Sequence, residues 1–295
     1  MKHVATIGEL RSLLDSARAD GRSVGFVPTM GYLHDGHVSL MRAARKDNDV
    51  VVSSVFVNPL QFAAHEDLDD YPRDLERDAS LAEDAGVDLL FVPSVDEMYP
   101  DGHPIPTTVS VGGVSEGYEG ASRPTHFAGV ATVVAKLFSI VGPCAAYFGE
   151  KDFQQLAVVR RMVADLSMPV DVIGCETVRE ADGLAMSSRN AYLTPAQRAA
   201  APVVNEALRT ASAAITDGET DPAAVRRIMS DVVGTRTGPE TDSELDYCDV
   251  VDAATFTTPD PLAGDLRLLI AVRFARTRLI DNVGVTAPAA PTRRS

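Results

Sequence analysis

The feature that most restricts the fold is an alternation of short β-rich runs with helical patterns along the first 180 residues. The β-rich runs are almost continuously apolar, which is typical of strands that are buried on both faces of a sheet. They lie at 23–29, 49–58, 88–93, 144–149 and 170–178. Strands that alternate with helices predict a doubly wound α/β domain, in which a parallel sheet is covered by helices on both faces.

The segments between these runs carry the helical patterns. The first, 6–21, opens with Thr6 and Glu9 in the spacing of a capping box and ends at Gly21. The other predicted helices span 37–48, 74–86, 127–142 and 152–167. A Gly- and Pro-rich stretch at 101–126 interrupts the alternation, and long loops in such folds are often functional.

The composition changes near residue 190, which indicates a second domain. Two helices are predicted to start at Thr194 and Asp221, and strands are predicted within 244–256 and 266–283. We interpret this part as a smaller C-terminal α+β domain. The predicted organisation is therefore a first domain at 1–177, a second domain at 178–285 and a disordered tail at 286–295.

The bulk properties exclude several classes of protein. No apolar run approaches the roughly 18 residues that span a bilayer, and the N-terminal segment lacks the pattern of a secretory signal, so we expect a soluble cytoplasmic protein without membrane contact. The net charge of −15 argues against a general nucleic-acid binder, although local basic groups can still bind a nucleotide. The three cysteines are far apart and fit neither a zinc pattern nor a disulfide framework.

Polar segments directly follow four of the predicted strands. They are "PTMGYLHDGH" (28–37), "NPLQF" (58–62), "GEKDFQQ" (149–155) and "READGLAMSSRN" (179–190). Ligands of open α/β sheets bind beyond the carboxyl ends of the strands, so these segments are predicted to form one site.

The first segment places His34 and His37 three positions apart, beside Gly31 and Gly36. The glycines permit close approach of a ligand to the backbone, and the helix that starts near His37 offers free N–H groups to an anion. A zinc site would need a third ligand, which the sequence does not suggest. The remaining alternatives are loop histidines without a role and histidines that donate hydrogen bonds to phosphate, and we favour the second.

Two further segments carry cations suited to phosphate. Lys151 stands at the end of a strand, where it supplies a point charge, although most lysines are simply solvated. Ser187, Ser188 and Arg189 place two hydroxyls and a guanidinium in three consecutive residues. Arg189 can bind two phosphate oxygens at once, whereas the alternative for this segment is a helix-capping loop.

Neutral amides and one acid complete the candidate set. Asn58, Gln61, Gln154 and Gln155 suit a substrate that carries hydroxyl and carboxylate groups. Asp78, on a predicted helix, is a candidate ligand of Mg²⁺ that is bound through ATP phosphates, and the alternative is a solvated helix face.

Together the residues indicate an enzyme that acts at the phosphates of a nucleotide. The sequence has neither the "GxxxxGK[ST]" loop of P-loop NTPases nor a "GxGxxG" after its first strand. Two histidines, a lysine and a Ser-Ser-Arg segment suggest attack on the α-phosphate of ATP.

At these residues the sequence resembles the pantothenate synthetases (pantoate–β-alanine ligases). The resemblance rests on "PTMGYLHDGH", "VFVNPLQF", "YPRD", "HFAGVATVV", "YFGEKDFQQL", "VREADGLAMSSRNAYLT" and "TRLIDN", which follow one another in order over roughly residues 5–285. The His-x-x-His portion also resembles the HIGH motif of the wider nucleotidyltransferase superfamily. Small departures are "FAAHEDL" at 62–68 and Ala128, which stands where many relatives carry arginine.

The resemblance implies a reaction in two steps. The pantoate carboxylate attacks the α-phosphorus of Mg·ATP to give pantoyl adenylate and pyrophosphate. The amine of β-alanine then attacks the activated carbonyl to give pantothenate and AMP, in the pathway to coenzyme A. The resemblance also implies that 1–177 is a Rossmann-like domain that binds the nucleotide and pantoate, and that 178–285 is a lid domain. It further implies a homodimer in the cytoplasm.

It further implies a role for each matching residue. His34 and His37 lie at the phosphates, with His37 in the proton-donor position and Lys151, Ser187, Ser188 and Arg189 as further catalytic groups. Gln61 holds pantoate and faces β-alanine, and Gln155 holds pantoate. The residues implied to bind ATP are Met30, Gly31, Tyr32, Leu33, His34, Asp35, Gly36, His37, Gly149, Glu150, Lys151, Asp152, Val178, Met186, Ser187, Ser188 and Arg189.

Two alternatives to this ligase remain open from the sequence. The first is a nucleotidyltransferase of the same superfamily, which would keep the nucleotide on its product. The second is a nucleotide-binding protein without catalytic activity, against which the number of charged and histidine side chains at the phosphates argues.

Overall fold

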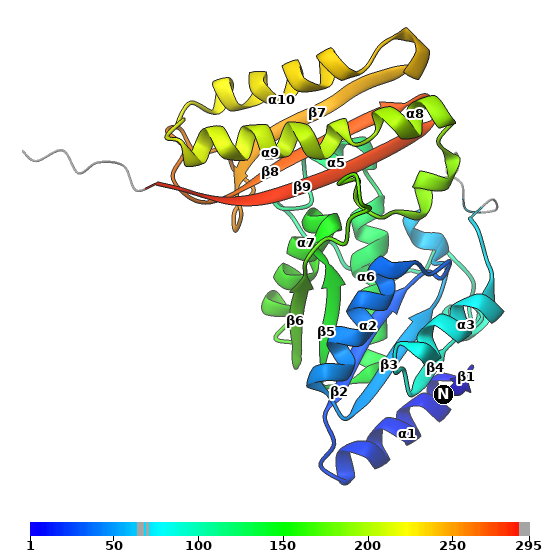
Figure 1. Ribbon diagram of the computed structural model, residues 1–295. Coiled ribbons are helices and arrows are strands. Elements are labelled where there is room, and N and C mark those ends of the chain that lie inside the picture. Colours follow the sequence, from blue (N-terminus) through cyan, green and yellow to red (C-terminus); the bar gives the residue numbers. More distant parts are fainter. Residues whose placement is uncertain (64–67, 69–70, 289–295) are drawn as a thin grey trace, which may run out of the picture. The chain divides into compact units, whose positions relative to one another are not determined.

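The computed structural model describes residues 1–63, 68 and 71–288, and the chain divides into two compact units, 1–177 and 178–295 (Figure 1). Each unit has its own sheet and its own core, and each is described by itself. Residues 64–67, which include most of the sequence departure at 62–68, lie outside the described part of the chain.

The first unit contains a six-stranded sheet in which all neighbouring strands are parallel, in the order β1-β4-β3-β2-β5-β6. Its strands are β1 (Lys2–Val4), β2 (Val24–Thr29), β3 (Val50–Val55), β4 (Leu89–Phe91), β5 (Cys144–Gly149) and β6 (Val170–Cys175). The five predicted strands are confirmed. No sequence signal marks β1, a three-residue edge strand that forms by pairing with β4.

Helices join these strands and cover both faces of the sheet. The longer ones are α1 (Ile7–Ala19), α2 (Asp35–Asp47), α3 (Leu75–Asp84), α6 (His126–Val141) and α7 (Phe153–Asp165). Because crossovers between parallel strands are right-handed, the strand order places α2 and α3 on one face and α1, α6 and α7 on the other. Contacts of α2 with α3, and of α6 with α1 and α7, agree with this division.

Short helices lie in the connections of the first unit. They are η1 (Pro59–Gln61), α4 (Val95–Met98), α5 (Tyr118–Ser122) and η2 (Glu150–Asp152). The α5 helix falls inside the stretch 101–126 that the sequence predicts as a loop. It is five residues long and is held from outside by Gln154, whose amide bonds the backbone of residues 114–119.

The composition of each helix matches its burial. The α6 helix is apolar around its circumference, and most of its residues are buried between the sheet and neighbouring helices. The α2 helix is amphipathic and buries Val38, Leu40, Met41 and Ala44 against the opposite face of the sheet. The sheet is therefore fixed on both sides, which gives its carboxyl edge a rigid support.

The second unit contains a three-stranded antiparallel sheet, and the strands predicted within 244–256 and 266–283 belong to it. Its strands are β7 (Ser243–Asp252), β8 (Gly264–Phe274) and β9 (Thr277–Ala287), in the order β7-β8-β9. Helices α9 (Val203–Thr216) and α10 (Pro222–Arg236) pack on it around one apolar core. Because β9 runs to Ala287, the predicted tail at 286–295 begins inside a strand; residues 289–295 lie outside the described chain.

The helix predicted from Thr194 is two helices, α8 (Pro195–Ala200) and α9. Pro202 is the cause, since proline lacks a backbone N–H and its ring clashes with the preceding turn. Pro202 is instead the N-cap residue directly before α9, where a missing N–H costs no intrahelical hydrogen bond. The remaining short helices of this unit are η3 (Ser188–Tyr192) and η4 (Pro239–Thr241).

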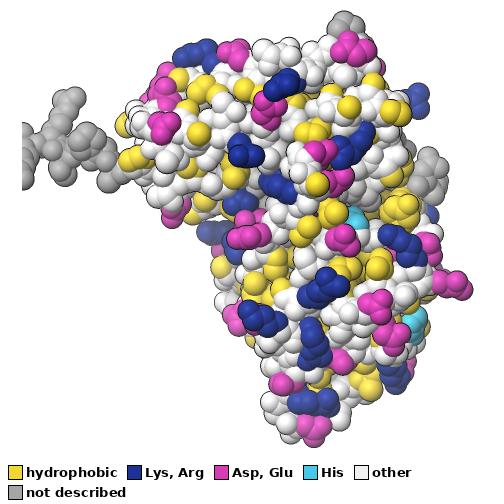
Figure 2. All heavy atoms as spheres, viewed as in Figure 1, with side chains coloured by type: hydrophobic (Ala, Val, Ile, Leu, Met, Phe, Trp, Pro, Cys, Tyr) yellow, Lys and Arg dark blue, Asp and Glu magenta, His cyan; other side chains and the backbone are white. Residues whose placement is uncertain are grey.

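The described residues include no helix that is long and apolar enough to cross a membrane. On the face of the molecule drawn in Figure 2, basic and acidic side chains are interspersed rather than gathered by sign.

Candidate active site

The strand order of the first sheet reverses between β2 and β5. From β2 the chain proceeds through β3 to β4 on one side, whereas β5 and β6 lie on the other side. Loops that follow the two strands at such a reversal flank the usual ligand site of open α/β sheets. The His34–His37 segment follows β2 and the Gly149–Asp152 segment follows β5, so the fold brings these two predicted segments to the same place.

The loop between β2 and α2 has an unusual backbone. Gly31 and Tyr32 have φ values of 85° and 51°, in the left-handed region that side chains with a Cβ rarely adopt. Asp78 of α3 holds this loop: its carboxylate accepts hydrogen bonds from the backbone N–H of Tyr32 and of Leu33, both at 2.7 Å. Asp78 is 1% exposed, so the alternative of a solvated helix face is wrong for this residue.

His34 and His37 lie at the start of α2, with ring centroids 4.1 Å apart. The Nδ1 atom of His34 accepts a hydrogen bond from the N–H of Gly36 at 3.2 Å. The Nδ1 atom of His37 accepts one from the N–H of His34 at 3.3 Å. An Nδ1 that accepts a bond carries no proton, so in the neutral ring the proton is assigned to Nε2. Each neutral ring thus carries its single N–H on Nε2.

Electrostatics keeps both rings neutral at ordinary pH. Burial, and after it the charge of the neighbouring His34, lowers the pKa of His37 to about 3. Burial also lowers the pKa of His34, with Lys151 as the next cause. The neutral histidines can therefore donate hydrogen bonds but carry no charge, and Lys151 supplies a positive charge near them.

Lys151 stands in η2, directly after β5. Its Nζ lies 3.3 Å from a carboxylate oxygen of Asp152, and its side chain is 19% exposed. The charges of Lys151 and Asp152 both act on the two histidines, which shows that the four side chains are near one another. Gly149, before η2, has an ordinary φ of −73°, and an added Cβ there would meet no atom within 4 Å. The space above Gly149 is open.

Gln61 and Asn58 form a second buried group beside this loop. Gln61 is 7% exposed, and its Nε2 lies 3.0 Å from the sulfur of Met30, which joins the segment after β3 to the loop after β2. Asn58 donates to the Oε1 of Gln61 and to the carbonyl of Gly129, both at 3.2 Å, and accepts from the hydroxyl of Tyr99 at 2.8 Å. Asn58 thus fixes the orientation of the Gln61 amide.

A glycine in α6 makes this arrangement possible. An added Cβ on Gly129 would lie 2.2 Å from the carbonyl oxygen of Leu60, so any larger residue would push η1 off the helix. His126, one turn earlier, lies with its Nδ1 3.1 Å from the carbonyl oxygen of Gln61. The "HFAG" motif therefore supports the Gln61 backbone.

The two glutamines after β5 differ in surroundings. Gln154 is 6% exposed, and its amide is occupied by three backbone groups of the 114–119 segment, so it supports that loop. Gln155, the predicted pantoate residue, is partly buried in the first turn of α7.

The Met186–Arg189 segment belongs to the second unit and follows a short hairpin there. Residues 179 and 185 form an antiparallel bridge, and the N–H of Met186 donates to the carbonyl of Val178 at 3.0 Å. Ser187 precedes η3, and its hydroxyl oxygen accepts from the N–H of Arg189 at 3.3 Å. Ser187 therefore caps η3, as the alternative of a helix-capping loop predicts for this residue. Its hydroxyl proton is still available for a ligand.

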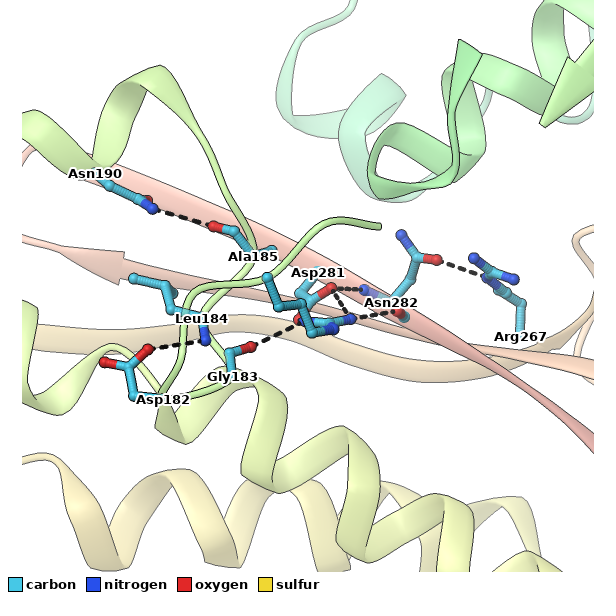
Figure 3. A network of polar contacts seen from close by, with 9 residues as sticks. Asp182, Gly183, Leu184, Ala185, Asn190, Arg267, Asp281 and Asn282 are labelled. Atoms are coloured by element: carbon cyan, nitrogen blue, oxygen red, sulfur yellow. Dashed lines mark hydrogen bonds and ion pairs between the residues drawn. The ribbon is translucent and has the colours of Figure 1, made fainter. Parts of the chain in front are cut away.

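An ion pair anchors this hairpin to the sheet. Arg179 donates to both carboxylate oxygens of Asp281 on β9, at 2.6 and 3.0 Å, and to the carbonyl of Gly183 at 3.2 Å. Figure 3 shows this network, in which Asn282, next to Asp281, also bonds Arg267 through its side chain at 2.6 Å. Asp281 is nearly fully buried. The Arg179–Asp281 pair is not predicted by the sequence analysis.

A second set of bonds closes the hairpin. Asn190 donates to the Glu180 carboxylate at 3.0 Å and to the carbonyl of Ala185 at 3.1 Å, and Arg198 of α8 pairs with both Glu180 and Asp182. The segment that carries Ser188 and Arg189 is therefore held at both of its ends.

Arg77 is another residue near the His34 loop, and no sequence motif marks it. Its guanidinium lies 5.5 Å from the ring centroid of Tyr32, and its charge is one of the causes that lower the pKa of His34. It adds positive potential at the His34 loop from the first turn of α3.

The six-stranded parallel sheet flanked by helices, with its two-histidine segment after β2, defines the class: an α/β protein of the HIGH-type nucleotidyltransferase kind. The model of the pantoate-beta-alanine ligase family matches residues 2–284. The chain therefore belongs to the pantoate-beta-alanine ligase family.

Curated relatives and solved structures agree. The chain is 50% identical to the pantothenate synthetase of Acetivibrio thermocellus over 96% of this chain and 99% of that protein. It is 53% identical to that of Moorella thermoacetica over 96% of this chain and 98% of that protein.

Two solved structures extend the comparison to the fold. The crystal structure of pantothenate synthetase from Thermus thermophilus is 50% identical and superimposes with a TM-score of 0.89 over 96% of this chain and 99% of that chain. The ligase from Francisella tularensis, solved in complex with β,γ ATP and β-alanine, is 33% identical with a TM-score of 0.76 over 96% and 97%.

Proposed function

We propose that this chain, a ligase, joins pantoate to β-alanine with ATP in two half-reactions, through a pantoyl adenylate intermediate. In the first, a pantoate carboxylate oxygen bonds to the α-phosphorus of ATP while the bond to pyrophosphate breaks. In the second, the β-alanine nitrogen bonds to the pantoyl carbonyl carbon, AMP leaves and the amine loses a proton. The products are pantothenate, AMP and pyrophosphate.

The observation that carries this proposal is the group formed by His34, His37 and Lys151 where the strand order reverses. Negative charge grows on the α-phosphate oxygens and on the leaving pyrophosphate in the transition state. Two preorganised Nε2–H donors and one ammonium suit that charge, because donors fixed in advance need no reorganisation during the reaction. His37 donates a hydrogen bond as a neutral ring.

The substrate assignments follow the neighbouring side chains. We place the pantoate at Gln61 and Gln155, with Asn58 acting through its bond to Gln61 rather than by contact, because its amide atoms are engaged by protein groups. The β-alanine site is placed at Gln61 as well. ATP is placed along Met30–His37 and Gly149–Asp152, where the open space above Gly149 admits a ligand.

The second unit is proposed to close the site. Ser187, Ser188 and Arg189 would contact the triphosphate, and Val178 and Met186 the nucleotide. A mixed anhydride reacts with water, so a cover that excludes water protects the intermediate. The hairpin bonds of the second unit support this role, since they fix the segment before a ligand arrives.

Mg²⁺ enters as part of the substrate Mg·ATP. The described residues contain no group of three or more His, Cys, Asp or Glu side chains arranged for a metal. The predicted ligand Asp78 does not fit a metal, because both of its oxygens accept backbone N–H bonds inside the protein. Mg²⁺ commonly binds through substrate phosphates and water, and no step here depends on a protein ligand for it.

An isotope experiment tests the intermediate. The chain is incubated with ATP, Mg²⁺, β-alanine and pantoate labelled with ¹⁸O in its carboxylate, and the AMP is analysed by mass spectrometry. Attack on the α-phosphorus transfers one ¹⁸O to AMP. Pantothenate formed with unlabelled AMP rules out the adenylate, and the absence of pantothenate rules out the ligase activity itself.

The same assay separates the alternatives. Release of AMP only when pantoate and β-alanine are both present excludes a nucleotidyltransferase, which keeps the nucleotide on its product. We further propose a cytoplasmic homodimer, on the strength of the family resemblance, and sedimentation of the purified chain tests the dimer.

A further inference from the structure

Asp78 is a buried carboxylate that the proposed reaction does not use. Its two oxygens accept the backbone N–H groups of consecutive residues, Tyr32 and Leu33, at 2.7 Å each, from a helix more than forty positions away along the chain. Carboxylates are rarely buried without a partner, and here the partners are neutral backbone groups rather than a cation. The loop they belong to carries His34.

We propose that Asp78 is a positioning residue that holds the loop at residues 30–33 so that the histidine rings meet the phosphates, and that it is not a ligand of magnesium. This inference rests on the proposed function of His34 and His37. It assigns to Asp78 a role that acts through the backbone of the loop.

The backbone of the loop explains why such a support is needed. Gly31 and Tyr32 both lie in the left-handed region, and Tyr32 carries a Cβ, so the loop does not favour this shape by itself. The only backbone–side chain bond that supports Gly31 among the described residues is its N–H to the hydroxyl of Thr29, at 3.2 Å. The two short bonds to Asp78 supply the remaining constraint.

The fit between Gly31 and Asp78 is close. An added Cβ on Gly31 would lie 2.9 Å from Oδ2 of Asp78 and 2.9 Å from a methyl group of Val55. Glycine is therefore required both for the φ value and for the approach of the carboxylate. The two residues form one unit, in which the loop shape and the position of the carboxylate depend on each other.

The loop sets the position of the donors. Leu33, whose N–H is held by Asp78, directly precedes His34, the residue that caps α2 through its own Nδ1. A change in the Leu33 peptide plane rotates the His34 backbone, and the N–H of His34 is the group that orients His37. Loss of the Asp78 bonds therefore moves both Nε2 atoms, and misplacement by about 1 Å can slow a reaction about a hundredfold.

The main experiment compares Asp78→Asn with the wild type and with Glu76→Gln, an exposed neighbour in the same helical turn. Hydrogen exchange of the Tyr32 and Leu33 amides is measured by NMR without any substrate. Pyrophosphate formation from ATP and pantoate gives kcat, the KM for ATP and the Mg²⁺ concentration for half-maximal rate. Circular dichroism reports the fold.

For Asp78→Asn we expect both amides to exchange at least about tenfold faster, and kcat to fall between about tenfold and a hundredfold. The Mg²⁺ concentration for half-maximal rate is expected to stay within about twofold of the wild type, and Glu76→Gln to match the wild type throughout. Unchanged exchange of the two amides overturns the proposal. An increased Mg²⁺ requirement, alone or with other changes, overturns the exclusion of a metal role.

Two features keep the test decisive. The amide exchange needs no substrate, so its result stands even if the proposed reaction proves wrong. If Asp78→Asn does not fold, the Gly31→Ala variant replaces it, because the added methyl group displaces the same carboxylate from the side of the loop. The same amide-exchange and Mg²⁺ measurements are then made on Gly31→Ala.

Discussion

The rings of His34 and His37 lie 4.1 Å apart, and the N–H of His34 donates to the Nδ1 of His37. A backbone N–H pointing at Nδ1 leaves no place for a proton on that atom. The pair is therefore fixed as two neutral rings with their protons on Nε2. This relationship decides how the site responds to pH.

We expect pyrophosphate formation to show no titration of His37 between about pH 6 and about pH 8, because burial and the neighbouring His34 lower the pKa of His37 to about 3. The rate is measured with saturating ATP and pantoate. A rate that rises toward low pH with a midpoint near the ordinary histidine value would show that a protonated ring is the active form.

The same shift makes stability depend on pH. Folded His37 has a pKa of about 3, whereas the unfolded residue takes up a proton near 6.5, so protonation favours the unfolded chain between these values. As the pH falls from about 6 to about 4, the wild type should lose stability faster than His37→Gln, by about 1 kcal/mol per pH unit. Urea unfolding of both proteins at several pH values measures the difference. If the free energy of unfolding changes with pH in the same way in both proteins, the lowered pKa of His37 is contradicted.

Replacement of a group that we propose to face the phosphates should stop the first half-reaction without unfolding the chain. For Lys151→Ala and for His37→Ala we expect pyrophosphate formation to fall by about a hundredfold or more, since each removes a donor to developing charge. Lys46→Ala, at the far end of α2, is the control. Pyrophosphate release at close to the wild-type rate in either variant would show that the assigned roles are wrong.

Gly149 allows the nucleotide position to be tested by one methyl group. The ligand-free fold accepts alanine there, because φ is ordinary and no atom lies within 4 Å of the added Cβ. We expect Gly149→Ala to leave the melting temperature nearly unchanged and to raise the KM for ATP about tenfold by crowding the ligand. Gly129→Ala, which clashes with Leu60, should instead lower the melting temperature. An unchanged KM in Gly149→Ala places ATP elsewhere.

The buried ion pair of the second unit should be costly to break. Asp281→Ala leaves the partly buried Arg179 guanidinium without its partner, and we expect a loss of about 3 kcal/mol in the free energy of unfolding. Asp165→Ala breaks the exposed pair with Arg161 and should cost about 0.5 kcal/mol. If both variants lose the same small amount of unfolding free energy, the Arg179–Asp281 pair does not anchor the hairpin.

The parts of the fold that could be predicted are those whose signal is local. The β2, β3 and β5 strands are short apolar runs, and the polar segments after them locate the site because parallel strands share a carboxyl edge. The β1 strand has no such signal: of its three residues only Val4 is buried, and pairing with β4 makes it a strand.

The site shows the same limit. His34, His37 and Lys151 are visible in sequence because their chemistry is unusual beside glycine and a strand end. The role of Asp78 is not, since it depends on the orientation of two backbone N–H groups in another segment. Tyr99 likewise reaches Asn58 from 41 positions away, and no local pattern announces that bond.

The pairing of Arg179 with Asp281 also orders events during protein synthesis. The ribosome delivers Arg179 102 residues before its partner. A nascent chain can thus complete the sheet that bears the histidines while the hairpin ahead of Ser187–Arg189 still lacks its anchor on β9. Because Asp281 lies on β9, the Ser187–Arg189 segment gains this anchor only after β9 has been made, long after the rest of its hairpin.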